Sequence, residues 1–156
     1  MISETMQYKK KSASVAGKQI AYVEEGSGDP IVLLHGNPTS SFLWRNIIPE
    51  LTDLGRVIVP DLIGQGDSEK LSVTEGPDRY SLEVAYSYVN GLLETIGANT
   101  KVTLVIHDWG SGIGFLWAMR NPEQTKGIAY MEAIVKPMTW DDWHKDAIGI
   151  FKGFRS

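Results

Sequence analysis

The sequence has no cysteine among its 156 residues. A disulfide framework, a thiolate metal site and a thiol nucleophile are therefore all excluded. Long hydrophobic runs are lacking too: the stretch from Met1 to Gly17 has no apolar signal segment, and no later run approaches the length of a membrane span. We therefore expect a cytoplasmic protein without a membrane partner.

Positively charged residues are also fewer than negatively charged ones. Fifteen Lys and Arg stand against 19 Asp and Glu, giving a net charge of −4. This balance disfavours nucleic acid or an anionic membrane as a partner. Hydrophobic residues, in contrast, make up 42% of the chain. That content and length predict one domain with a substantial core.

The order of apolar and amphipathic segments predicts an α/β fold. Two short strands are expected to form a hairpin around Ala16-Gly17, and from Pro30 onward strands and helices alternate. The expected strands are 29–38, 56–64, 101–108 and 126–135, and the expected helices are 40–55, 81–98, 109–123 and the tail from about 140. Such alternation favours a mostly parallel sheet with helices on both faces.

Polar residues follow four of these strands. They are His35-Gly36-Asn37, Asp61, His107-Asp108-Trp109 and Glu132. Because ligands bind beyond the carboxyl ends of parallel strands, we expect these residues to share one rim of the sheet. The glycines of the turn DLIGQGDSEK, residues 61–70, are expected opposite this rim, and the turn lacks a phosphate-loop pattern.

The stretch VTLVIHDWGSGIGFLWAMR, residues 102–120, has the pattern of a nucleophile elbow, a strained turn between a strand and a helix. The position of the reactive serine in G-x-S-x-G is taken here by Asp108. This aspartate could instead cap the following helix. A reactive role is favoured because the Trp109 indole and the Asn37 amide supply N–H donors that suit an anion produced nearby. Glu132 ends the next strand, where it could orient a histidine base.

Four stretches resemble the haloalkane dehalogenase branch of the α/β-hydrolase superfamily. They are HGNPTSSFLWRNIIP, DLIGQGDSEK, VIHDWGSGIGFLWA and MEAIVKPMTWDDW, and the similarity runs from about Gly17 to Ser156. The resemblance implies an α/β-hydrolase fold truncated at the start of its helical cap. Residues 1–137 would belong to the main domain and residues 138–156 to the cap.

The resemblance also implies roles for individual residues. Asp108 would attack the halogen-bearing carbon of a small haloalkane, while Asn37 and Trp109 hold the leaving halide. Water would then hydrolyse the Asp108 ester with the help of a histidine base and Glu132. No cofactor and no metal is implied. The family's apolar substrate pocket corresponds to Ile134, Trp143 and Phe151, where plain packing predicts the same residue types.

The family's histidine base has no counterpart among the three histidines. We expect structural roles for His35 and His107, and His144 has no evident route to the ester. The resemblance therefore leaves three options: a fragment, a chain that pairs with a second, C-terminal polypeptide, or a longer protein. Alone, the chain should alkylate once and stall. A half-built sheet would also leave a strand edge unpaired, which favours self-association or poor solubility.

Two other functions stay open. Coelenterazine-type luciferases resemble this family and keep the Asp-Trp elbow and the asparagine, although Pro38-Thr39 and Ser111 favour the dehalogenase pattern. Epoxide hydrolases are not among the open functions, because they share the elbow but usually lack Asn-Pro-Thr. The remaining alternative is a scaffold without catalysis that binds a partner chain or an apolar ligand.

Overall fold

The computed structural model describes residues 2–136 and 139–153, with the backbone alone at 140 and 150–153. Its six-stranded sheet has the order β1-β2-β4-β3-β5-β6. The strands are β1 (Lys11–Val15), β2 (Lys18–Glu25), β3 (Pro30–Leu34), β4 (Arg56–Pro60), β5 (Val102–Asp108) and β6 (Thr125–Ala133). The α-helices are α1 (Ile48–Leu51), α2 (Leu82–Thr95), α3 (Trp109–Arg120) and α4 (Lys145–Gly153). Short 3-10 helices are η1 (Ser41–Trp44), η2 (Val73–Glu75), η3 (Pro122–Gln124) and η4 (Trp140–Asp142).

The predicted α/β organisation is confirmed. β1 and β2 form an antiparallel hairpin whose turn residues, Ala16 and Gly17, have φ of 49° and 80°. From β3 onward the expected alternation holds, and β3 pairs in parallel with both β4 and β5, as β5 does with β6. All five residues of β3 are buried, as expected of a central strand covered on both faces.

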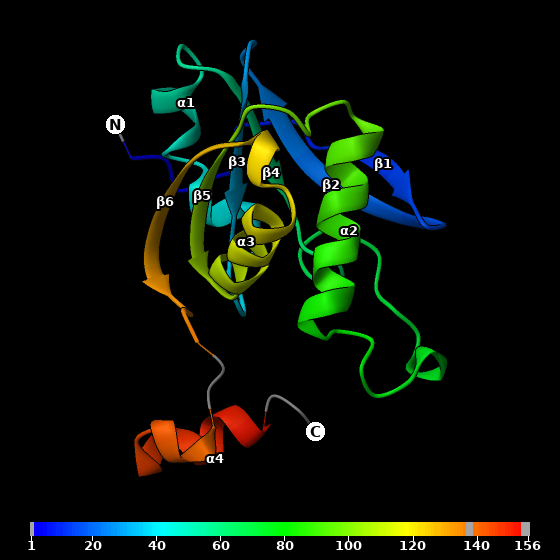
Figure 1. Cartoon of the computed structure of the whole chain (residues 1–156), viewed down its shortest axis with the longest axis vertical. Helices are drawn as coiled ribbons and strands as arrows, with labels where there is room; N and C mark the ends of the chain where they lie inside the picture. The colour runs from blue at the N-terminus through cyan, green and yellow to red at the C-terminus, as the bar shows by residue number, and fades with distance from the viewer. Residues whose placement is uncertain (1, 137–138, 154–156) are drawn as a thin grey trace.

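Alternation along the strands builds a core on each face of the sheet. Val32, Ile58 and Leu104 pack toward α2 and α3, which lie side by side in front of the sheet in Figure 1. Their neighbours Leu33 and Val57 pack toward Trp44 of η1 and Ile48 of α1 on the opposite face. The central strands are thereby fixed from both sides, and the site lies at their carboxyl ends.

The helix predicted over 40–55 is not continuous. It divides into η1 and the four-residue α1, with a turn between them. Proline lacks a backbone N–H and obstructs the preceding helical turn, so Pro49 is accommodated in the first turn of a new helix. The cap predicted at Ser81, in contrast, is present: its hydroxyl accepts the Val84 N–H at the start of α2.

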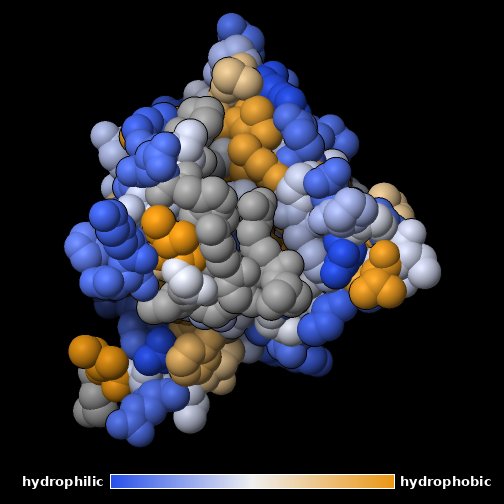
Figure 2. All heavy atoms as spheres, turned by 90° about the horizontal axis from the view of Figure 1, so that it is seen from below, coloured by the Kyte–Doolittle hydropathy of each residue, from blue (hydrophilic) through white to orange (hydrophobic). Residues whose placement is uncertain are grey.

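β6 lies at the edge of the sheet. Within residues 2–136 and 139–153 it pairs with β5 alone, and most of its residues are exposed. Ile128 is 38% exposed and Tyr130 is 61% exposed, high values for large apolar side chains in a strand. Figure 2, which views the molecule from below, shows hydrophobic side chains in patches among hydrophilic ones on this face.

Candidate functional site

Asp108 stands on a strained turn between β5 and α3. Its φ of 50° and ψ of −123° are rare for any residue with a side chain. Close packing after it supports the turn, because a Cβ on Gly110 would lie 2.5 Å from the carbonyl oxygens of Leu34 and His35. The backbone therefore has the form of the predicted elbow.

The Asp108 carboxylate does not cap α3, because its side chain makes no cap hydrogen bond there in the described structure. Its Oδ1 accepts the backbone N–H of Asn37 at 2.8 Å instead. Gly36 lies directly behind the carboxylate, and a Cβ at that position would overlap it. The helix-cap interpretation is therefore wrong, and the carboxylate is held against the loop that follows β3.

Of the two predicted donor residues, Trp109 neighbours this carboxylate in sequence and Asn37 contacts it in space. Trp109 begins α3 directly after Asp108, and it packs, partly buried, against the core on the α2 and α3 side of the sheet. Asn37 is exposed beyond the end of β3, with its backbone N–H on Asp108. β3 and β5 are neighbours in parallel register, with Leu34 opposite Ile106, so both donors are delivered to one rim.

Glu132 occupies a β-bulge beside the elbow. His107 is opposite Met131 and Asp108 is opposite Ala133, which leaves Glu132 as the extra residue, with φ of 47°. A bulge redirects the side chain of its extra residue. Glu132 borders an apolar cavity of about 430 Å³, whose other lining residues are Leu43, Trp44, Ile47, His107 and Met131.

Ser111 ties the elbow to the chain that leaves β6. Its buried hydroxyl donates to the Asp108 carbonyl oxygen and accepts the Ile134 N–H at 2.7 Å. Ile134 is half-buried next to the elbow, whereas Trp143 lies half-buried after η4. The side chain of Phe151, in α4, lies outside the described part. The prediction that these three residues line a substrate pocket stays a prediction.

His35 has the predicted structural role. Its ring is fully buried, with Nδ1 donating to the Gly36 carbonyl oxygen and Nε2 accepting the Leu62 N–H, both at 3.0 Å. This pattern requires a neutral ring, and burial lowers the pKa of His35. His107 differs, because its buried Nδ1 makes no hydrogen bond within the described residues. His144 is exposed, 3.4 Å from an Asp146 oxygen.

The buried His35 predicts a loss of stability in acid. Its pKa in the fold is below the ordinary value of 6.5, so the unfolded chain takes up the proton first. The free energy of unfolding should therefore fall as the pH drops below about 6.5, by up to about 1.4 kcal/mol between pH 7.5 and pH 5.5. Urea unfolding at several pH values measures this. A His35→Gln chain should lose that slope, whereas exposed His144→Gln should keep it; equal slopes in both variants would contradict the assignment.

The turn between β4 and η2 lies at the same rim of the sheet as Asn37, contrary to the expectation for its glycines. The Gln65 amide Nε2 donates to Asn37 Oδ1 at 2.5 Å, and Gly66 packs against the carboxylate of buried Asp61. Asp61 in turn accepts the Ser41 N–H at 2.7 Å. Sequence reasoning missed Gln65 because a glutamine in a turn has no motif that marks it.

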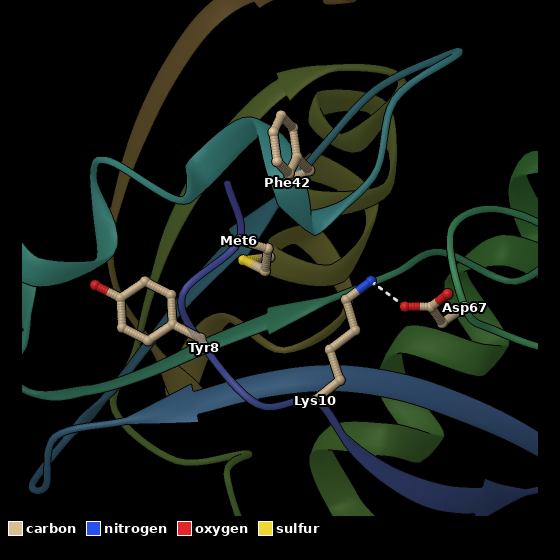
Figure 3. Close-up of a pocket in the computed structure, with 5 residues that line it drawn as sticks. All are labelled: Met6, Tyr8, Lys10, Phe42 and Asp67. Carbon is tan, nitrogen blue, oxygen red and sulfur yellow. Dashed lines mark hydrogen bonds and ion pairs between the residues drawn. The ribbon is translucent and has the colours of Figure 1, made fainter. Parts of the chain in front are cut away.

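A second hollow, of about 350 Å³, lies between the N-terminal segment and η1 (Figure 3). Met6, Tyr8, Lys10, Phe42 and Asp67 line it. Its Lys10 ammonium is already paired with Asp61 and Asp67, each at 2.6 Å. No group of three or more His, Asp or Glu suited to a metal occurs within residues 2–136 and 139–153. No described helix is both long and apolar enough to cross a bilayer.

Known proteins resemble this chain in fold and in sequence. Residues 29–156 match the family described as alpha/beta hydrolase fold. A haloalkane dehalogenase from Sphingobium indicum is 50% identical over 147 residues, which cover 94% of this chain and 49% of that protein. The structure of haloalkane dehalogenase DbeA from Bradyrhizobium elkani matches with a TM-score of 0.84 at 35% identity, over 96% of this chain and 51% of that one. The epoxide hydrolase CorEH matches with a TM-score of 0.78 at 30% identity, over 95% and 50%.

The chain spans about half the length of the curated relatives it matches. The expected fold class and the resemblance to haloalkane dehalogenases are both confirmed by these matches. The Asp-Trp elbow, the bulge at Glu132 and the Asn37 loop all lie within the matched region. This chain belongs to the alpha/beta hydrolase fold family and is a homologue of the haloalkane dehalogenases over their N-terminal portion.

Proposed function

We propose that this chain carries the nucleophile and the leaving-group site of a hydrolytic haloalkane dehalogenase. The observation that carries the proposal is the Asp108 carboxylate, which is presented on a strained turn and held by the Asn37 N–H rather than by a helix end. The names of its relatives support the same reaction class. The substrate is then a small haloalkane, and no cofactor takes part.

In the first step, Asp108 Oδ2 attacks the saturated carbon that bears the halogen. The new C–O bond forms as the carbon–halogen bond breaks, and the halide leaves with the bonding electron pair. A carboxylate, unlike a serine hydroxyl, attacks without losing a proton to a neighbouring group, so this step needs no base. The Trp109 indole N–H and the Asn37 amide N–H stabilise the departing anion. The product is an alkyl ester of Asp108.

In the second step, water attacks the carbonyl carbon of that ester. The Asn37 backbone N–H, already on Asp108 Oδ1, stabilises the negative charge that develops there. The water needs a base, and the resemblance to the family implies that none of the three histidines of this chain is that base; both ring nitrogens of His35 are already engaged. A histidine supplied from outside residues 1–156, oriented by Glu132, fills this role. The 156-residue chain by itself therefore stops at the ester.

Intact-mass spectrometry after incubation with 1-bromobutane tests the proposal. We expect one butyl adduct, located by tryptic digestion to the peptide 102–120, which holds Asp108. An Asp108→Ala chain should gain no adduct. A wild-type chain that neither gains an adduct nor releases bromide would contradict the proposed first step. Continuous bromide release without an adduct would contradict the proposed lack of a base.

The exposed edge of β6 favours a partner for the second step. This strand carries Glu132 and pairs with β5 alone in the described structure. A complementing C-terminal chain that adds a strand there would bring its histidine to the Glu132 side of the elbow. Bromide release should then continue past one equivalent only when that chain is added. A chain that binds the partner without bromide release would favour the alternative of a non-catalytic scaffold.

A further inference from the structure

The side chain of Asn37 is held at its carbonyl end. Gln65 Nε2 donates to Asn37 Oδ1 at 2.5 Å, while the Asn37 backbone N–H donates to Asp108. Within residues 2–136 and 139–153, Asn37 Nδ2 takes part in no hydrogen bond. An amide whose oxygen is occupied and whose nitrogen is unoccupied presents two N–H donors to its surroundings. The leaving-group site needs such donors.

Gln65 is itself fixed by the turn around it. Its backbone N–H donates to the Leu62 carbonyl at 2.9 Å, and its carbonyl accepts the Ser68 N–H at 3.1 Å. Leu62 donates to the buried ring of His35, and the Ser68 hydroxyl donates to the Asp61 carbonyl. The glutamine therefore projects from a turn that is bonded to the ends of β3 and β4, the strands beside the site.

The opposite orientation of the two amides is disfavoured. Gln65 Oε1 is buried and has no hydrogen-bond partner in the described structure. Rotating the amide would place the NH₂ group there, which would bury two unpaired donors instead of one unpaired acceptor. Buried N–H groups without a partner are rarer in proteins than under-satisfied carbonyl groups. Because the Oε1 side of the Gln65 amide is buried with no hydrogen-bond partner among the described residues, the Nε2 atom is the one that faces Asn37.

We propose that Gln65 is a positioning residue for the leaving-group site: by donating to Asn37 Oδ1, it keeps the Asn37 N–H donors directed at the departing halide. This inference rests on the proposed function. If the Gln65 amide were inverted or lost, Asn37 could turn its oxygen toward the halide, and the contact would change from attraction to repulsion. Gln65 itself touches neither the reacting carbon nor the nucleophile.

Two substitutions test this with the rate of adduct formation from 1-bromobutane. Gln65→Met keeps the size of the side chain and removes the donor, and we expect about a 10-fold slower alkylation at every pH. Gln65→Glu offers a carboxylate, which would attract the Asn37 NH₂ group away from the halide. At pH 8 we expect this variant to be slower still. At lower pH the protonated acid can donate to Asn37 Oδ1, so its rate should rise between pH 8 and pH 5.

The rising rate of the Gln65→Glu chain in acid is the decisive result, because loss of structure alone would not reverse with pH. Gln124→Met and Gln124→Glu are matched controls: Gln124 is also half-buried, but it lies in η3 at the opposite end of the sheet. They should alkylate at the wild-type rate. Two results would refute the role of Gln65 in a chain whose wild type alkylates: both Gln65 variants react at the wild-type rate, or both are slowed equally at every pH. In either case the proposed function stands. If the wild-type chain forms no Asp108 adduct, the proposed function and the proposed role of Gln65 are both contradicted.

Discussion

A Gly36→Ala chain is expected to fold and yet to alkylate at least about 100-fold more slowly than wild type. The added Cβ would overlap the Cβ, Cγ and Oδ1 atoms of Asp108, so the whole carboxylate must move. A displacement of about 1 Å at a reacting group can cost about 100-fold in rate. Gly36 does not have the positive φ that would strain an alanine. The measurement is the rate of adduct formation from 1-bromobutane.

Gly127→Ala is the matched control for this substitution. Gly127 lies in β6, has no positive φ, and a Cβ there would meet nothing within 4 Å. This variant should alkylate at the wild-type rate. Thermal unfolding of both variants separates a displaced nucleophile from a lost fold. A Gly36→Ala chain with wild-type alkylation would show that the carboxylate does not need its present place against the β3 loop.

Replacing Asp61 with asparagine is expected to destabilise the fold by about 3 kcal/mol. The carboxylate is fully buried and accepts from Lys10 Nζ and from the backbone N–H groups of Ser41 and Asp67. Burial opposes its ionisation, but these donors outweigh burial and lower the pKa of Asp61. Asparagine would remove the charge and turn an NH₂ group toward at least one of the donors. Breaking a buried charged network costs about 3–5 kcal/mol, and urea unfolding measures the loss.

Asp67→Asn provides the comparison, because both aspartates accept from the same ammonium at the same distance. The Asp67 side chain is 71% exposed, whereas that of Asp61 is 0% exposed. An exposed ion pair contributes about 0–1 kcal/mol. We therefore expect at most a small loss for Asp67→Asn. Equal losses in the two variants would contradict the view that burial, rather than the ion pair, sets the importance of Asp61.

Those parts of the fold that depend on local pattern could be predicted from the sequence. The alternation from Pro30 onward gave the parallel core, and Ala16-Gly17 gave the hairpin, because hydrophobic periodicity and turn chemistry are properties of neighbouring residues. The elbow at Asp108 was predictable for the same reason. Pro49 divided the helix predicted over 40–55, since one residue without an N–H outweighed an apolar spacing that suited a helix.

Features that depend on how distant segments of the chain meet in the fold could not be predicted from the sequence. The bulge at Glu132 exists only in the register of β6 against β5, which no single strand specifies. The contact of Gln65 with Asn37 joins residues that lie 28 positions apart. Glu132 and Gln65 can both be read in the sequence, but their positions beside the site depend on the sheet order β4-β3-β5-β6. The motif marks the proposed nucleophile, Asp108, and the topology decides which residues surround it.

The single pairing partner of β6 also divides the site by local stability. Asp108 ends β5 and Asn37 follows β3, two strands that have neighbours on both sides, whereas Glu132 lies in β6, an edge strand of the described sheet. A strand held along one edge opens at a lower free energy than a central one. Fluctuations that detach β6 would therefore release Glu132 and leave the elbow intact. In the proposed reaction, the halide-displacing step would then depend on a region that opens at a high free energy, and the ester-hydrolysing step on one that opens at a lower free energy.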